Sequence, residues 1–235
     1  MNRKINAFNA PATARLIFFI VGAVYCHGPA HGQLPDAHLD IVATTGGPAT
    51  GGQTFVDLGT LIAESPVIND RGQVLFVGFT GTAAQPFSGL YLADTDRQLR
   101  RVAGDGDVLP GAGGLLVGVL TSPGLDNDDG IVAATLFVDE LFNPFPAVVE
   151  RGVILEHDGA VQTLARDGQP TPAGGIWGQV NLRTDINTFG DVLVSNVLGL
   201  PQTVFMFNPD MGSDTVFLAG VTTPIGHRGI TRSCV

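Results

Sequence analysis

A pattern that recurs about every sixty residues constrains the fold of this chain more than any other feature. Three segments share an Asn-x-x-Gly core, and they begin at Asn69, Asn127 and Asn187, which stand 58 and 60 residues apart. Each core is followed by an apolar run, at residues 74–79, 131–138 and 192–197. Self-similarity at a fixed period of this length is typical of proteins built from repeated supersecondary units.

Two further markers recur in the same order. A Val-Ala or Leu-Ala pair leads into a loop rich in Pro and Gly at residues 42–52, 102–114 and 164–175. A short apolar segment lies between the two markers at residues 89–92, 152–155 and 203–206. Residues 218–226 look like a degraded copy of the Pro- and Gly-rich marker. Three markers in a constant order indicate about three copies of one unit.

The local chemistry of the markers predicts strands and tight turns. An Asn or Asp side chain hydrogen-bonds to the backbone two residues on, and Gly tolerates a positive φ. Each core, flanked by β-branched and aromatic residues, therefore predicts a hairpin. We expect the first unit to hold four strands, at about residues 74–80, 89–93, 98–103 and 115–120.

Four antiparallel strands per unit predict an all-β protein with propeller-like blades, and a β-sandwich is the alternative. About three units fit into a single domain over residues 33–235, whereas closed propellers have 4 to 8 blades. The assembly is therefore expected to be partial or open. Open sheet edges predict pairing with another chain, such as a second copy in a homodimer. A truncated copy of a longer protein is a further interpretation.

Composition narrows the class of protein. Hydrophobic residues make up 44% of the chain and charged residues only 14%, which suits a packed core and argues against disorder. The net charge of -10 repels phosphate, so the sequence excludes a basic nucleic-acid-binding protein.

Residues 1–32 are typical of a secretory signal peptide. Basic residues precede an apolar run from Leu16 to Cys26, which is too short to span a bilayer. We expect cleavage before Gln33, a mature chain without a membrane span, and export to the periplasm, the cell surface or the extracellular space. Acylation of Cys26 is an alternative, although Tyr25 before it does not suit a lipobox. Cleavage leaves Cys234 as the one cysteine, so no intramolecular disulfide is expected.

The three markers resemble a family of exported bacterial tandem-repeat proteins of unknown function. Its units read roughly as Asn-Asp-x-Gly, then Gly-Ile-Tyr, then Val-Ala-x-x-Gly-Asp-x-x-Pro-Gly-x-Gly-Gly. The match covers most of residues 40–220 and is best over 66–130. This resemblance implies export and a propeller-like repeat fold, and it brings no known catalytic residues.

Two groups of aspartates are candidate Ca²⁺ ligands: Asp105 and Asp107, and then Asp126, Asp128 and Asp129. Calcium takes 6 to 8 oxygen ligands, and short carboxylates supply them. Neither group has the spacing of an EF-hand loop. Because these aspartates recur at turns, hydrogen bonds from their side chains to the backbone are the competing interpretation. No other cofactor is expected.

The sequence contains no motif for nucleophilic catalysis. It lacks Gly-x-Ser-x-Gly, His-Glu-x-x-His and a P-loop lysine, so no catalytic residue is assigned. Glu140, Glu150 and Glu156 are the one loose group of glutamates, and we expect them to be solvated. Trp177 is expected to pack across a neighbouring sheet, and stacking on a carbohydrate is the alternative.

These observations predict an exported, non-enzymatic β-repeat protein that acts by surface contact with a glycan or a protein. Two other functional interpretations stay open. The chain could be an extracellular carbohydrate-active hydrolase or lyase on a propeller scaffold, because sequence alone does not exclude a pair of catalytic carboxylates. It could also be a truncated fragment without an independent function.

Overall fold

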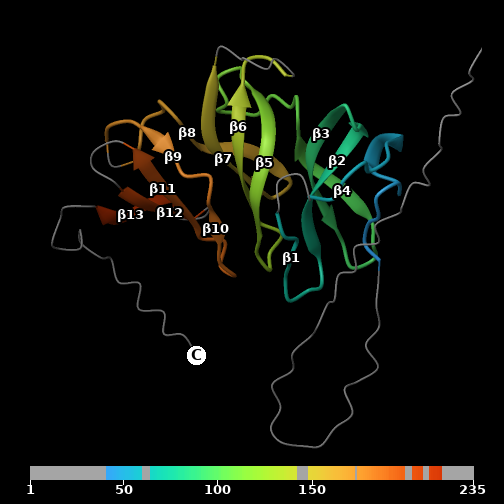
Figure 1. Ribbon diagram of the computed structural model, residues 1–235. Helices are drawn as coiled ribbons and strands as arrows, with labels where there is room; N and C mark the ends of the chain where they lie inside the picture. The colour runs from blue at the N-terminus through green and yellow to red at the C-terminus, as the bar shows by residue number, and fades with distance from the viewer. Residues whose placement is uncertain are drawn as a thin grey trace, which may run out of the picture.

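The computed structural model describes residues 41–59, 64–141, 148–172, 174–198, 203–208 and 212–218. Within these residues the chain forms thirteen strands and no α-helix, and a single 3-10 turn, η1, spans Thr50–Gly52. The strands form three antiparallel sheets that follow one another across the molecule in chain order (Figure 1). The predicted all-β class with four-stranded antiparallel units is therefore confirmed.

Each sheet is a meander of neighbouring strands. The first contains β1 (Val67–Ile68), β2 (Val74–Thr82), β3 (Gln85–Ala93) and β4 (Leu99–Gly104) in that order. The second contains β5 (Leu116–Leu125), β6 (Ile131–Val138), β7 (Val149–His157) and β8 (Ala160–Arg166). The third contains β10 (Asp185–Ile186), β11 (Val192–Leu198), β12 (Thr203–Asn208) and β13 (Gly212–Leu218), and β9 (Gln179–Val180) also pairs with β11.

The division of the strands into units differs from the sequence prediction by one strand. Residues 115–120 were expected to be the last strand of the first unit, but residues 116–120 lie in β5, the first strand of the second sheet. The reason is that β5 pairs with β6 through the turn that joins them, whereas β4 pairs with β3 alone. A Pro- and Gly-rich marker thus separates two sheets instead of connecting two strands of one sheet.

The first strand of a unit is continuous in the second sheet and interrupted in the other two. In the third sheet β9 and β10 both pair with β11, in the way that the two ends of β5 pair with β6. In the first sheet two separate segments pair with β2 in the same way. One is the short β1, and the other is an isolated bridge between Asp57 and Phe79. All three units therefore start with the same strand position.

The Pro- and Gly-rich markers form equivalent hairpins. The backbone N–H of Phe55, Val117 and Trp177 donates to the carbonyl oxygen of Gly47, Asp107 and Gln169 at 3.0, 2.8 and 2.8 Å. The return bonds run from Gly46, Gly106 and Gly168 at 2.7, 2.8 and 2.7 Å. Recurrence of the same bond pair at spacings of about sixty residues shows that the repeat is structural.

The sheets pack face to face through apolar side chains. Leu75, Leu90 and Leu92 of the first sheet form one core with residues of the second, including Val117 and Ile131. A separate core joins the second sheet to the third. This stack is not closed into a barrel, and the arrangement fits both an open propeller-like assembly and a sandwich of sheets.

Several sequence predictions lie outside the described residues. These are the signal peptide at 1–32, the acylation alternative at Cys26, the cysteine at position 234, and most of the degraded copy at 218–226. Among the residues that the structure does describe, no helix has the length and apolar character needed to cross a membrane.

Candidate functional site

Three turns at the start of β2, β6 and β11 are built by one side-chain device. The Oδ1 atom of Asn69 accepts from the backbone N–H of Arg71 and Gln73 at 3.1 and 3.0 Å. The Oδ1 atom of Asn187 accepts in the same way from Phe189 and Asp191 at 2.9 and 3.0 Å. Such bonds close an Asx turn and fix the geometry of the hairpin.

In the second unit this role belongs to Asp126 and not to Asn127, which corrects the sequence alignment by one residue. Its Oδ1 atom accepts from Asp128 N at 2.8 Å and from Gly130 N at 2.6 Å. Burial raises the pKa of the Asp126 carboxyl, and these two backbone bonds act in the opposite direction. An aspartate oxygen accepts the backbone bonds of the turn as well as an asparagine oxygen does. The position of the asparagine in the motif therefore did not identify the residue that closes the turn.

The residue with a positive φ in the turn also shifts by one position in the second unit. Gly72 and Gly190 have φ of 80° and 78°, as predicted, but in the second unit the positive φ of 68° falls on Asp129. Gly130 is required for another reason, because a Cβ atom there would collide with the Asp126 carboxylate. An aspartate tolerates the left-handed region better than most residues do.

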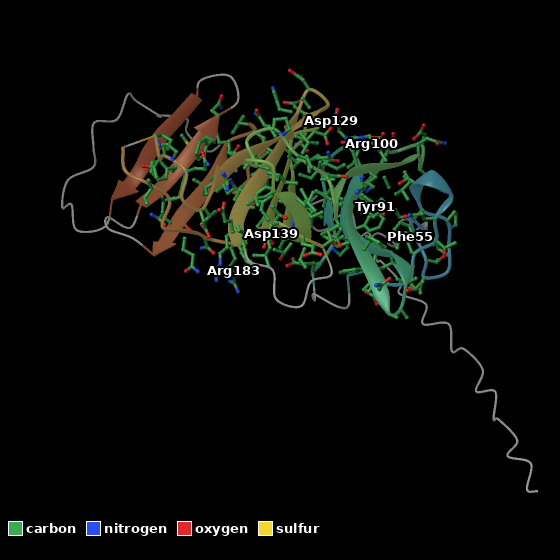
Figure 2. The ribbon with its side chains drawn as sticks, turned by 90° about the horizontal axis from the view of Figure 1, so that it is seen from above. Phe55, Tyr91, Arg100, Asp129, Asp139 and Arg183 are labelled. Carbon is green, nitrogen blue, oxygen red and sulfur yellow. The ribbon has the colours of Figure 1, made fainter. Side chains whose placement is uncertain are left out.

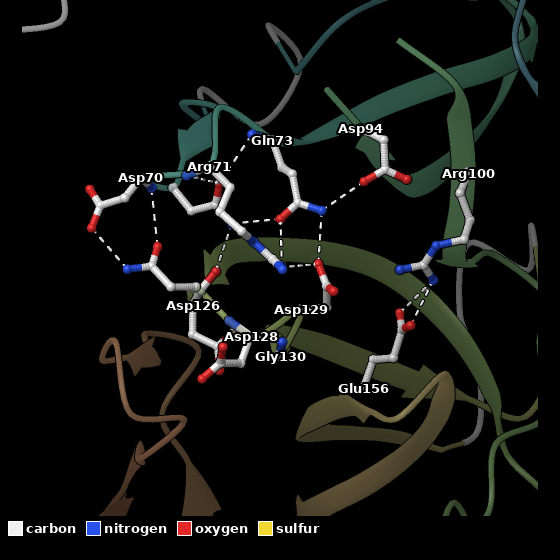
Figure 3. A network of polar contacts seen from close by, with 12 residues as sticks. Asp70, Arg71, Gln73, Asp94, Arg100, Asp126, Asp128, Asp129, Gly130 and Glu156 are labelled. Carbon is white, nitrogen blue, oxygen red and sulfur yellow. Dashed lines mark hydrogen bonds and ion pairs between the residues drawn. The ribbon is translucent and has the colours of Figure 1, made fainter. Parts of the chain in front are cut away.

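The turns of the first and second sheets are bonded to each other (Figure 3). Asn69 Nδ2 donates to the carbonyl oxygen of Asp126 at 2.8 Å. Asp70 N donates to Asn127 Oδ1 at 3.1 Å, and Asn127 Nδ2 donates back to Asp70 Oδ2 at 2.8 Å. Asn127 therefore joins two repeat units, which is a different function from the one that its place in the motif predicted.

Asp129 is the centre of the next layer of contacts. Its carboxylate pairs with Arg71 and accepts from Gln73 Nε2 at 2.8 Å, and the same Gln73 nitrogen donates to Asp94 Oδ1 at 2.7 Å (Figure 3). Gln73 is buried, so its amide links three elements within a protected environment. The left-handed turn position points this carboxylate across to the first sheet.

An ion pair between the two sheets lies beside this network. Arg100 of β4 donates from Nη1 to both carboxylate oxygens of Glu156 in β7, at 2.7 and 2.8 Å. The Glu156 side chain is 3% exposed and that of Arg100 is 43% exposed. The prediction that Glu156 is solvated was wrong. Glu140 is exposed, and Glu150 pairs with Arg166.

These contacts border a pocket of about 470 Å³ between the first and second sheets. Its charged lining consists of Asp94, Arg100, Asp128, Asp129, Glu156 and Asp158. These five carboxylates outnumber the guanidiniums that pair with them, which are Arg100 in the lining and Arg71 at Asp129, so the pocket has a net negative character. The Asp158 side chain is 89% exposed, so part of this lining is open to a ligand from solution.

A second polar pocket, of about 370 Å³, lies on the first sheet and includes Tyr91, Arg101 and Asp105. Asp105 Oδ2 accepts from Ser88 N at 2.7 Å, its Oδ1 accepts from Ser88 Oγ, and its own N–H donates to Ser88 O at 2.9 Å. Asp167 makes the same pair of backbone bonds with Arg151, at 2.9 Å each. Since this contact recurs in the next unit, it holds the marker hairpin against the sheet.

The calcium candidates do not converge. Asp105 bonds to Ser88, and Asp107 bonds to Gly104 N and to Arg101. The other three aspartates lie in the Asp126 turn. Within the described ranges, no three acidic, histidine or cysteine side chains gather in an arrangement suited to a metal. Calcium binding stays a prediction.

Trp177 is buried at 2% exposure and contacts Phe205 edge-on at a ring distance of 4.8 Å. The prediction that it packs against a neighbouring sheet is confirmed, because it belongs to the core between the second and third sheets. A buried indole is not accessible for stacking on a carbohydrate. The equivalent Phe55 contacts Tyr91 in the same edge-on manner at 5.0 Å.

The raised pKa of Asp105 gives a testable dependence of stability on pH. Burial is the main cause that raises this pKa from 3.8 to about 6. Between these values the unfolded chain has lost the proton and the folded chain keeps it, so stability falls as pH rises. We expect this group to lower the free energy of unfolding by about 2–3 kcal/mol from pH 4 to pH 6.5.

Denaturant unfolding of the wild type and of Asp105→Asn at several pH values measures this effect as a difference between the two proteins. The asparagine keeps an acceptor for Ser88 N and does not titrate, so the variant gains relative stability across that window. Asp105→Ala loses the bonds to Ser88 as well as the charge, so it should be less stable than Asp105→Asn at every pH. The difference between these two variants measures the contribution of the Ser88 bonds. A difference between wild type and Asp105→Asn that stays constant with pH would contradict the assignment.

The chain is an all-β protein built from repeated antiparallel sheets that stack on one another. Hydrogen bonds join the turns of the first two sheets, and an acidic pocket lies beside these turns. The chain belongs to the family of unknown function DUF7453, whose model matches residues 32–206. No curated protein matches the sequence significantly. The resemblance drawn from the markers is thus confirmed as far as membership of an uncharacterised family, while its exported nature stays a prediction.

Proposed function

We propose that this protein is an exported, non-enzymatic binding protein that contacts a glycan or another protein through the acidic pocket between its first two sheets. The observation that carries the proposal is the group of five carboxylates around one arginine in that pocket. Export is supported by the basic and apolar pattern of residues 1–32.

The chemistry of the lining favours a ligand with positively charged groups. Carboxylates bind ammonium and guanidinium groups through charge-assisted hydrogen bonds, and an amino sugar or a basic peptide presents such groups. The net charge of -10 adds a long-range attraction for such ligands. A pocket of a few hundred Å³ suits a small part of a larger ligand.

The walls of the pocket are held before any ligand arrives. Asp129 is fixed by Arg71 and Gln73, and Glu156 is fixed by both of its bonds to Arg100. A site whose side chains are already ordered loses less conformational entropy on binding. Asp128 and Asp158 then supply the carboxylates nearest to solution.

A hydrolase or lyase is the second candidate, and one observation favours it. Asp105 has a pKa raised to about 6 and lies in a pocket with Tyr91 and Arg101, which is the kind of environment that tunes a catalytic acid. The recurrence of its backbone contact at Asp167 supports a structural role instead. Binding without turnover is therefore the function that we favour.

Removing two charges from the pocket tests its role. In Asp128→Asn/Asp158→Asn we expect affinity for a glucosamine polymer, or for a lysine-rich peptide, to fall about tenfold or more at low salt. The matched control is Asp139→Asn. Asp139 follows β6 whereas Asp129 precedes it, so the control removes an exposed acid at the other end of that strand (Figure 2).

Titration calorimetry with both ligands and with a neutral glucan measures the three affinities. The pocket variant removes two charges and the control removes one. Equal losses of binding free energy per charge removed would therefore show that only the overall charge matters, and this would contradict a site in the pocket. Repeating the titration with Ca²⁺ and with EDTA tests the calcium prediction in the same experiment.

A further inference from the structure

Each sheet has one face that packs against the sheet that follows it in the chain, which we call the forward face. On the first sheet this face carries Leu75, paired in register with Leu92, and both lie in the core shared with the second sheet. On the second sheet it carries Val132, paired with Leu155, and both lie in the core shared with the third sheet. These four side chains are at most 3% exposed.

The forward face of the third sheet repeats part of this pattern, with Ser195 at the position of Val77, but it is open. Leu193 stands six residues after Asn187, as Leu75 stands six after Asn69 and Val132 six after Asp126. It pairs with Met206, and its side chain is 44% exposed although Leu75 and Val132 are fully buried. Val204 and Met206 beside it are only half-buried. Exposed apolar side chains that gather on one sheet face are typical of an interaction surface.

In the two internal contacts the covering unit contributes a large apolar residue soon after the marker alanine of the preceding sheet. Val117 follows Ala103 by 14 residues, and Trp177 follows Ala165 by 12. At the corresponding distance from Ala219 the sequence has Thr231, Arg232 and Ser233, which are polar. None of these three positions therefore offers a large apolar side chain like Val117 or Trp177.

Most of the opposite end of the stack is covered by the chain itself. The outer face of the first sheet holds Phe76 and Tyr91, which are 6% and 1% exposed because Phe55, Val42 and Ala43 pack against them. Figure 1 shows this N-terminal segment on the side of the first sheet away from the second. The described part of the chain thus has one open apolar face at one end of the stack.

We propose that the forward face of the third sheet docks on the same face of a second copy of this chain, in a two-fold symmetric dimer. A head-to-tail contact would need a complementary open face at the other end of the stack, and that end is capped. One open face on the described part of each chain is satisfied by an isologous contact, in which the same patch lies on both partners. The third sheet then receives the cover that the first and second sheets have.

One residue on this face limits the affinity of the dimer. Asp185 occupies the position of Val67 in the first sheet and of Gly124 in the second, and its side chain is exposed. Two copies bring two of these carboxylates to one interface, so association is expected to strengthen with added salt. Asp185→Val is expected to lower the dissociation constant about tenfold.

Sedimentation equilibrium of the purified chain over a range of concentrations tests the proposal. We expect a reversible monomer–dimer equilibrium in the wild type. Leu193→Asp should raise the dissociation constant about 100-fold or more, because the substitution enters a two-fold interface twice. Val149→Asp is the matched control: Val149 is 52% exposed but lies on β7 of the second sheet, so the equilibrium should be unchanged.

A second variant separates the two-fold contact from a head-to-tail one. Ile68 is 46% exposed, and its counterparts Leu125 and Ile186 are buried in the cores that join each unit to the preceding sheet. In a two-fold dimer Ile68 lies outside the interface, so Ile68→Asp should leave the dimer intact. Dissociation of the dimer in this variant would overturn the two-fold symmetry. A wild-type monomer at every concentration, or a dimer that survives Leu193→Asp, would overturn the proposal. If Leu193→Asp does not fold, Asp185→Val decides, because an unchanged or weaker dimer would contradict the assigned face.

Discussion

Replacing Trp177 by alanine is expected to lower the free energy of unfolding by about 3–5 kcal/mol. The side chain is 2% exposed and lies in the core between the second and third sheets, where its ring meets that of Phe205. Its removal leaves a cavity that neighbouring strands cannot fill by small shifts, because their side chains are themselves close-packed. Denaturant unfolding followed by circular dichroism measures the loss, since the variant lacks the single tryptophan of the chain.

The matched control for this substitution is Ile176→Ala. Ile176 is the preceding residue in the same hairpin, but its side chain is 65% exposed. We expect its replacement to change the free energy of unfolding by less than about 0.5 kcal/mol. Similar losses for the two variants would show that the hairpin does not insert Trp177 between the sheets, and the stacking described here would be wrong.

Replacing Arg100 by alanine is expected to lower the free energy of unfolding by about 2–4 kcal/mol. The Glu156 carboxylate is 3% exposed, and both of its oxygens accept from Arg100. Loss of the arginine leaves a buried charge without a partner, which is the costly way to break an ion pair. The estimate lies below the usual cost for fully buried pairs because Arg100 is 43% exposed and water enters more easily there.

Two comparisons isolate the ion pair. Arg101 is the next residue and pairs with Asp107 at 3.1 Å at a more exposed site, so Arg101→Ala should cost less than about 1 kcal/mol. Adding Glu156→Gln to Arg100→Ala should restore at least half of the lost stability, because the buried charge is gone. Thermal and urea unfolding of the three variants measures these terms. An Arg100→Ala variant as stable as Arg101→Ala would contradict the proposed link between the sheets.

The repeat and the strand content could be predicted from the sequence because both depend on local chemistry. Turn residues and alternating apolar runs recur at fixed spacing, and the structure places strands at each of them. The assignment of β5 to a sheet could not be predicted in this way. Local pattern locates a strand and the connections on either side of it. The Pro- and Gly-rich loop before β5 and the turn after it both have the chemistry of strand connections, and only the packing of the sheets decides which of the two separates the units.

The error at Asn127 has a chemical origin. The motif placed Asn127 and Gly130 in register with Asn69 and Gly72, but Asp126 and Asp129 hold those roles. Asn and Asp oxygens accept the same backbone bonds, and both residues tolerate a positive φ, so four consecutive residues of these types leave the register undefined. Gly130 was present for a steric reason that only the position of the Asp126 carboxylate reveals.

The candidate pocket was foreseen in part. Asp128 and Asp129 were singled out as oxygen-bearing residues, and both line it. Arg100 was missed and Glu156 was predicted to be solvated, because their contact joins different sheets across 56 residues. One signal could have found them: contacts between adjacent units recur at separations near one repeat length, as in the pair of Arg71 with Asp129 across 58 residues.

In the proposed function the acidic pocket binds a ligand and leaves it chemically unchanged. The most direct test is a single titration of the purified chain into a glucosamine polymer, with bound protein and polymer length read from the same samples. We predict saturable binding that weakens in Asp128→Asn/Asp158→Asn, with the length of the polymer unchanged. Progressive shortening of the polymer that stops in Asp105→Asn would contradict the claim, and it would identify the protein as a glycan-cleaving enzyme.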